Sequence, residues 1–438
     1  MSVRGRAQHK RRLGQSFTRL CAGFTLASAG DGFAYGAVPL LAVAINPHPL
    51  AVSSVVAADT LPWLVLALPA GHFADRYKRW LVAALSNVIR AAAFLIATVL
   101  VATHHMSLGF LIVVVLINAA SRAMYYSSFQ AMVPSVARSN DLERANGVLS
   151  ATEMGAEHIA GPILGSSLFA ISSALPFLAD SIALVSSCFP FARLRSKISA
   201  PPRSSDPSSD SIWEGIRLLL ADARLRILLI LITSLALLQG MESGVLVLLA
   251  TKRWGVSEGA YGLFLAGVAI GNIVGSLIAE GQAKRFGSAR AIIGFAIVSG
   301  TGYLLMASAH SWVLAGPAFA LTGVAVVVIS VIGLSLRQRI TPDHLMGRVG
   351  GAWRGIVWGA APLGALVAGG VASLWGLKVP LVLAGSLQIL VACVLARPLL
   401  RIIQDDRIRK NSAERRRHAP GNGSLATEAA PFTSLDPQ

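Results

Sequence analysis

Apolar runs of membrane-spanning length recur along the whole chain of 438 residues, and this recurrence limits the possible fold more than any other feature. We place these runs at about 17–45, 51–70, 81–103, 107–128, 145–170, 174–192, 226–250, 258–281, 289–309, 311–335, 344–373 and 378–397. Each can cross a hydrocarbon core of about 30 Å at about 1.5 Å per residue. Hydrophobic residues form 54% of the chain and charged residues 13%, unlike soluble domains. The sequence therefore predicts an all-α polytopic membrane protein with twelve transmembrane helices.

The positive charges are unevenly distributed between the loops that join these runs. The net charge is +17, yet the only cations in the loops of one side are Lys252, Arg253 and Lys378. Three arginines lie inside apolar runs, and the other cations fall on the opposite side. This asymmetry argues against nucleic-acid binding and marks the crowded side as cytoplasmic. We expect a monomer in the lipid bilayer of the cell membrane, with both termini in the cytoplasm.

Changes in composition divide the chain into five parts. Residues 1–16 form a basic cytoplasmic tail, residues 17–195 a first bundle of six helices, and residues 226–397 a second. The segment 196–225 between them begins with Ser, Pro and Asp, which predicts a linker, and continues into an amphipathic interfacial helix. Residues 398–438 have basic clusters followed by Gly, Pro, Ser and Ala, which predicts a disordered cytoplasmic tail.

The loop after the second run carries a recognisable charge pattern. Gly71, Asp75, Arg76 and Arg79 match the G-x-L-a-D-R-x-G-R signature between the second and third helices of the major facilitator superfamily, which this chain resembles. Lys78 replaces the second glycine of the signature. The resemblance implies a gating loop in which the carboxylate and arginines form a breakable cytoplasmic contact. A simple positive-inside loop is the alternative.

An internal repeat supports two related halves. At an offset of 208 residues, Gly36 matches Gly244, and Pro134 after the fourth run matches Pro342 after the tenth. The gating loop has a degenerate counterpart around Arg285, without an acidic residue. The segment 213–226 also resembles the entry to the second half in exporters similar to the enterobactin and macrolide efflux proteins. Together these features imply the major facilitator fold, with two six-helix bundles related by pseudo-two-fold symmetry.

Signatures of catalysis are absent from the sequence. It contains no G-x-x-x-x-G-K-[ST], H-E-x-x-H, G-x-S-x-G or C-x-x-C pattern, so we expect a protein that is not an enzyme and needs no cofactor. Cys21, Cys188 and Cys393 are far apart in sequence and predict neither a disulfide framework nor a metal site. The remaining candidates are ionisable residues inside apolar runs, where each is costly unless paired or wet.

Asp31 and Arg90 are the first such pair. Asp31 lies about 18 Å past Arg19 along the first run, near the membrane midplane, and flanking glycines allow close approach. We expect Asp31 to act in the substrate cavity or in proton coupling. The alternative is that it is a structural partner of Arg90 in the third run, and this role is compatible with the first. Cleavage of a signal peptide near residue 29 would remove Asp31 from the midplane, but the apolar run continues past that site.

The fifth run carries two further acids and a glycine-proline motif. Glu153 and Glu157 are spaced i, i+4, so they share a helix face where repulsion favours a proton on one of them. Gly161, Pro162 and Gly165 resemble the fifth-helix signature of proton-coupled antiporters in this superfamily. Glu157 and Ser166 depart from that signature at its first and last glycines. Simple helix packing by small residues is the alternative.

The second half offers fewer candidates. Glu242, within the seventh run, is the best cavity carboxylate there, and Arg354 in the eleventh run is its possible counter-ion. Asp180 and Glu280 fall near the ends of runs, where snorkelling or capping accounts for them. Arg122 also lies near the predicted end of its run, so the role of the fourth-helix arginine in this superfamily is not assigned to it.

These features predict a secondary transporter that exports a small amphipathic compound, such as a drug, an antibiotic or a siderophore, in exchange for protons. An importer or facilitator of a polar nutrient is the alternative within transport, and would have more Asn, Gln and aromatic hydrogen-bonding groups along its cavity. A receptor or scaffold that uses the fold without transport is the alternative outside it.

Overall fold

The computed structural model describes residues 14–137, 141–194, 210–342 and 345–418, and of 65–76, 210–212 and 402–418 only the backbone. All regular structure in these ranges is helical, and ten of the helices are long and apolar enough to cross a membrane. Their outward faces remain apolar: Leu277 and Leu374, for example, are 76% and 73% exposed. Such side chains are stable against lipid, so the chain is a multi-pass membrane protein.

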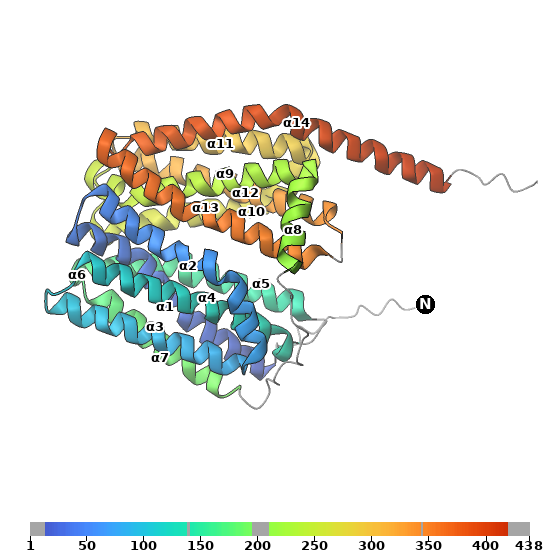
Figure 1. Ribbon diagram of the computed structural model, residues 1–438. Coiled ribbons are helices and arrows are strands. Elements are labelled where there is room, and N and C mark those ends of the chain that lie inside the picture. Colours follow the sequence, from blue (N-terminus) through green and yellow to red (C-terminus); the bar gives the residue numbers. More distant parts are fainter. Residues whose placement is uncertain (1–13, 138–140, 195–209, 343–344, 419–438) are drawn as a thin grey trace, which may run out of the picture.

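The helices before the linker form the first group, which lies below the second in Figure 1. They are α1 (Gln15–Ile45), α2 (Pro49–Arg76), α3 (Arg79–Ala102), α4 (Leu108–Val136), α5 (Leu142–Glu153), η2 (Met154–Ala160), α6 (Gly161–Ile171) and α7 (Leu175–Ala192). Within this group α4 packs on α2 and α3, and α7 packs on α1 and α3.

The helices after the linker form the second group. They are α8 (Asp210–Ala221), α9 (Ala223–Leu248), η3 (Leu249–Arg253), α10 (Glu258–Phe286), α11 (Ser288–Ser308), α12 (Trp312–Ile340), α13 (Met346–Trp375) and α14 (Val379–His418). Within this group α9 packs on α13, and α12 packs on α10 and α11. The short helix α8 packs on α13 and α9 at one end of the group.

Two of the twelve predicted spans are not among the ten apolar helices. The described side chains of α2 are apolar over Pro49–Leu64, which is too short. The predicted fifth span is helical from Leu142 to Ile171, but a π-helix, η2, divides it. The count of twelve transmembrane helices therefore stays a prediction.

Several predicted boundaries are wrong by one or more helical turns. The expected loop at residues 71–79 is mostly helix, since only Tyr77 and Lys78 separate α2 from α3. Helix α4 continues to Val136, two turns beyond the apolar run, because its last residues pack within the first group. Helix α14 continues to His418, so this part of the tail is helical and not disordered; Figure 1 shows it projecting beyond its neighbours.

The connections 46–48, 103–107, 172–174, 254–257, 309–311 and 376–378 lie together at one end of the helices, which we call the weakly charged end. The opposite end, with the linker and both ends of the described chain, is the basic end. The two groups meet at the weakly charged end through α6 and α10, where the Ser166 hydroxyl accepts a hydrogen bond from the Gly262 N–H at 3.0 Å. The hydrogen of this hydroxyl points to the carbonyl oxygens of Gly259 at 3.1 Å and Ile163 at 3.2 Å.

The glycine-proline motif lies at a three-helix junction. Gly161, Pro162 and Gly165 are all buried, and their backbone packs directly on α1. A methyl group added at Gly161 would meet the backbone of Gly32, and one added at Gly262 of α10 would meet the Pro162 carbonyl. The small residues thus let α6 pack between α1 and α10, which agrees with the packing interpretation of the motif.

Candidate functional site

A cluster of charged side chains lies in the middle of the first group. Arg90, on α3, is fully buried and forms an ion pair with Asp31 of α1. Its other nitrogens donate hydrogen bonds to Asn118 Oδ1 at 2.8 Å and Asn87 Oδ1 at 3.2 Å. The Asn87 amide in turn donates to Ser187 Oγ at 2.8 Å. A buried guanidinium with this many acceptors is held in one position.

Arg122 joins this pair to a second carboxylate. Its Nη2 forms an ion pair with Glu157 of η2, and its Nε lies 3.5 Å from Asp31 Oδ1. Asp31 is therefore shared between two arginines, while Arg122 is shared between two acids. The Arg122 side chain is 25% exposed, whereas the side chains of both acids are less than a tenth exposed. The four residues form a charge-balanced network with one partly accessible member.

The predicted position of Arg122 was wrong. Because α4 runs from Leu108 to Val136, Arg122 lies at its middle and not near its end. The sequence signal was present, since an arginine inside an apolar run is costly unless paired. What the apolar run alone did not reveal was the extra length of the helix.

Other acids surround the network. Tyr126 donates a hydrogen bond to Glu153 at 3.3 Å, and Glu153 lies within electrostatic range of both Arg122 and Glu157. Asp59 of α2 lies within electrostatic range of Arg122.

Asp180 was expected to be explained by its place near a helix end. It is completely buried, and neither carboxylate oxygen has a hydrogen-bond partner among the described residues. Snorkelling or capping therefore does not account for Asp180.

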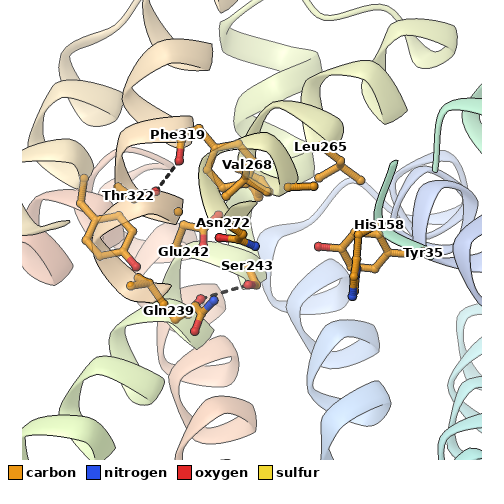
Figure 2. Close-up of a pocket in the computed structure, with 15 residues that line it drawn as sticks. Tyr35, His158, Gln239, Glu242, Ser243, Leu265, Val268, Asn272, Phe319 and Thr322 are labelled. Atoms are coloured by element: carbon orange, nitrogen blue, oxygen red, sulfur yellow. Dashed lines mark hydrogen bonds between the residues drawn. The ribbon is translucent and has the colours of Figure 1, made fainter. Parts of the chain in front are cut away.

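A pocket of about 210 Å³ lies where the first group meets the second. Tyr35 of α1 and His158 of η2 line it from the first group, and residues of α9, α10, α11 and α12 complete it. Figure 2 shows Tyr35 and His158 together on one side, with Glu242 and Asn272 opposite them. Among the described residues, the pocket combines aromatic, amide and hydroxyl side chains with a single carboxylate, which is Glu242.

Glu242 has no described counter-ion. It is 5% exposed, and its Oε1 has no hydrogen-bond partner among the described residues. The predicted partner, Arg354, is exposed on α13, and no ion pair in the described part of the chain joins the two. Arg354 instead lies within electrostatic range of Arg337. The structure therefore does not support Arg354 as the counter-ion of Glu242, because its exposed side chain does not line the pocket.

The network and the pocket share two elements of the fold. On α1, Asp31 belongs to the network and Tyr35, one turn later, belongs to the pocket. On η2 the adjacent residues Glu157 and His158 divide in the same way. Adjacent residues of a helix point in different directions, so the two side chains reach different sites, and π-helical turns are frequent at functional sites. Any movement of α1 or η2 thus reaches both sites.

The predicted gating loop is only partly described. The side chains of Gly71, Asp75 and Arg76 lie outside the described residues, although their backbone is helical. Arg79 donates a hydrogen bond from Nη1 to the backbone carbonyl of Ala131, at 3.0 Å, and so ties α3 to α4 at the basic end. On the second half, the guanidinium of Arg285 lies 5.1 Å from the ring of Phe286.

Comparison with known proteins identifies relatives over almost the whole chain. The model of a family described as transmembrane secretion effector matches residues 15–426. The chain is 28% identical over 392 residues to the multidrug efflux pump Tap of Mycolicibacterium fortuitum, covering 87% of this chain and 94% of that protein. Both the family and this relative are transporters and not enzymes.

Solved structures share the fold at lower identity. A bacterial homologue of the iron transporter ferroportin, in an inward-facing state, is 17% identical, with a TM-score of 0.69 over 88% of this chain and 100% of its own. The POT family transporter PepTSo is 13% identical, with a TM-score of 0.73 over 90% of this chain and 99% of its own. These likenesses establish the transporter fold.

Proposed function

Because the chain belongs to the transmembrane secretion effector family of the major facilitator transporters, we propose that it is a proton-coupled exporter of small amphipathic compounds, such as a drug, an antibiotic or a siderophore. The observation that carries this proposal is the network of Asp31, Arg90, Arg122 and Glu157, in which one arginine bridges two buried carboxylates. The name of the relative Tap supports export as the direction of transport.

The network can respond to a proton because its charges are balanced. A proton that binds Asp31 or Glu157 neutralises one of the carboxylates held by Arg122. The guanidinium then moves toward the remaining acid, because an unpaired charge inside the membrane is costly. This movement changes the contacts of α4 with α1 and η2. Since α1 and η2 also line the pocket through Tyr35 and His158, the change reaches a bound substrate.

The proton gradient provides enough energy for such a cycle. One proton that moves through 100 mV provides about 2.3 kcal/mol, and each pH unit adds about 1.4 kcal/mol. Together these correspond to a substrate gradient of a few hundredfold, since about 1.4 kcal/mol is a factor of ten. Alternating access then requires the two groups of helices to rock about the pocket.

Transport by everted membrane vesicles tests this proposal. Vesicles that contain the protein should accumulate amphipathic dyes and antibiotics from a panel when a proton gradient is imposed, and an uncoupler should abolish the accumulation. Vesicles with Glu157→Gln should lose most of the dependence on the gradient. Accumulation that an uncoupler leaves unchanged would contradict proton coupling.

A polar-nutrient importer is the second candidate. The pocket supports it because Gln239, Asn272, Tyr35 and Tyr303 provide the hydrogen-bonding groups expected for a polar substrate. The direction of transport separates the two functions. An importer would accumulate its substrate in right-side-out vesicles, whereas an exporter would do so in everted ones.

We also propose that the basic end faces the cytoplasm of a cell-membrane protein, and that Asp75 holds this end closed during part of the cycle. The basic residues at that end support the orientation. A reporter fused after Asn411 should be cytoplasmic, and one inserted in residues 254–257 should be external. Asp75→Asn should raise cysteine labelling at the basic end more than Arg285→Ala does, because the second loop has no acid. Equal labelling in Asp75→Asn and Arg285→Ala would mean that the loop only orients the chain in the membrane.

A further inference from the structure

The side chains of Glu242, Ser243 and Thr322 present hydrogen-bond acceptors to the pocket, beside amide, tyrosine and histidine groups of its lining that can also donate. The Ser243 hydroxyl donates its hydrogen to the Gln239 carbonyl at 3.0 Å, and the Thr322 hydroxyl donates to the Phe319 carbonyl at 2.7 Å. Figure 2 shows both bonds running from the pocket wall to the backbone. The lone pairs of the two hydroxyl oxygens therefore remain free to accept. Glu242 Oε1, which has no described partner, adds a carboxyl oxygen as a further acceptor.

The charge in this wall is not balanced by another residue that lines the pocket. Among the described residues that line it there is no lysine or arginine, and Glu242 is the only acid. The titratable groups that face Glu242 are His158 from η2, Tyr35 from α1, Tyr261 from α10 and Tyr303 from α11. A carboxylate at this depth is costly without a cation, so the site is suited to a ligand that brings one.

The other lining groups indicate what surrounds that cation. Tyr35, Tyr303 and Phe319 present aromatic rings, which attract cations and accept apolar groups. The volume of about 210 Å³ is below the range of about 300–1,000 Å³ found for drug-sized ligands. The pocket is therefore large enough for the head group of an amphipathic molecule and too small for the whole of a drug-sized one.

From this geometry we propose that the pocket binds the ammonium group of a cationic amphipathic substrate, with Glu242 as the counter-ion and Ser243 and Thr322 as further acceptors. The proposal rests on the proposed transport function and adds its substrate class. An ammonium group has three donors and one positive charge, which is the complement of this wall. A neutral or anionic molecule of the same shape would leave Glu242 without a partner.

Equilibrium binding to the purified protein in lipid nanodiscs tests the assignment without any gradient. The probes are 2-naphthylethylamine and 2-naphthylethanol, a fluorescent pair in which only the amine is cationic at pH 7. Binding is measured against empty nanodiscs. The amine should bind at least tenfold more tightly than the alcohol, and Glu242→Gln should remove that preference. Glu242→Asp should keep part of it, and Ser243→Ala should weaken amine binding severalfold.

The matched control is Glu280→Gln. Glu280 is an acid on α10 that pairs with Lys284 at the surface, outside the pocket, and this variant should bind both probes like the unmodified protein. No binding of either probe, equal binding of both, or an unchanged preference in Glu242→Gln overturns the assignment. Proton-driven export of neutral compounds alone would overturn it and leave the proposed function intact. If the amine binds as expected but an uncoupler leaves transport unchanged, proton coupling would be overturned and the assignment of the pocket would stand.

Discussion

The buried acids of the network, in the first half, and of the pocket, in the second, are held in opposite ways, although the first half also contains Asp180 without a described hydrogen-bond partner. In the first half, Asp31 and Glu157 are each paired with an arginine, and Asn87 and Asn118 complete the shell around Arg90. In the second half, Glu242 is equally buried but has neither an arginine nor a described hydrogen bond at Oε1. A satisfied network fixes the helices that carry it, whereas an unsatisfied acid is available to a ligand.

This difference indicates a division of labour between the halves. The paired network contains arginines that can exchange partners when a proton binds, so it suits coupling. The unpaired acid lies in a pocket, so it suits recognition. The network and the pocket share α1 and η2, so small movements of these two elements can couple them. The predictions below test whether the network and the pocket are as distinct as their geometry indicates.

The largest effect should come from Arg90→Leu. Removal of one partner from a buried ion pair costs about 3 to 5 kcal/mol, because the remaining acid is buried with less compensation. The melting temperature in detergent, followed by size-exclusion chromatography, should fall strongly. Arg354→Leu is the control, since this arginine is exposed in the second half. Equal losses in the two variants would mean that burial of the ion pair does not decide stability here.

Neutral variants of the acids should separate coupling from recognition. Asp31→Asn and Glu157→Gln keep the shape of the side chains but cannot change charge. The change in transport rate across the pH series should therefore shrink by about tenfold or more. Glu242→Gln should reduce transport of cationic substrates while their remaining transport still responds to pH. Initial rates in proteoliposomes across a series of pH values measure both effects. If Asp31→Asn and Glu157→Gln keep normal pH dependence, Glu153 or Glu242 becomes the proton site.

A smaller effect is expected where the halves meet at the weakly charged end. Ser166→Ala removes the acceptor of the Gly262 N–H and a donor to Gly259, at about 0.5 to 1.5 kcal/mol for each bond. The population open at this end should rise about fivefold to a hundredfold, since about 1.4 kcal/mol is a factor of ten. Spin labels at Ile171 and Glu258, in a protein without its native cysteines, would report a longer distance.

Ser167→Ala is the matched control for this variant. The Ser167 hydroxyl donates only to Ile163 of its own helix, at 2.7 Å, and its side chain is exposed. Its spin-label distances should therefore equal those of the unmodified protein. Equal opening in Ser166→Ala and Ser167→Ala would show that the bonds to α10 do not hold the two halves together.

The smallest effect should come from the surface ion pair between Arg348 of α13 and Glu214 of α8. Both side chains are more than 40% exposed, so water and salt already compensate their charges. Glu214→Gln should lower stability by less than about 1 kcal/mol. Melting temperatures at low and high salt measure this. A loss that approaches that of Arg90→Leu would remove the contrast between buried and exposed pairs.

Much of the candidate site could be named from the sequence, but its pairing could not. Asp31, Arg90, Glu157 and Glu242 stand out because each interrupts an apolar run, where an ionisable group is rare. The pairing of Asp31 with Arg90 was one of the interpretations weighed, and the structure contains it. The central place of Arg122 was missed, since the apolar run ends well before helix α4 does.

The sequence by itself determined the helical class, the membrane location and the set of buried ionisable residues. The cost of placing a polar group in hydrocarbon acts on each segment separately, so it can be read locally. Only the tertiary structure decided that Arg122 bridges Asp31 and Glu157, that Arg354 does not line the pocket, and that Glu242 has no counter-ion among the described residues. Ion pairs between helices depend on the rotation and register of each helix against its neighbours. Those quantities follow from close packing, such as that of α6 between α1 and α10, and no single apolar run contains them.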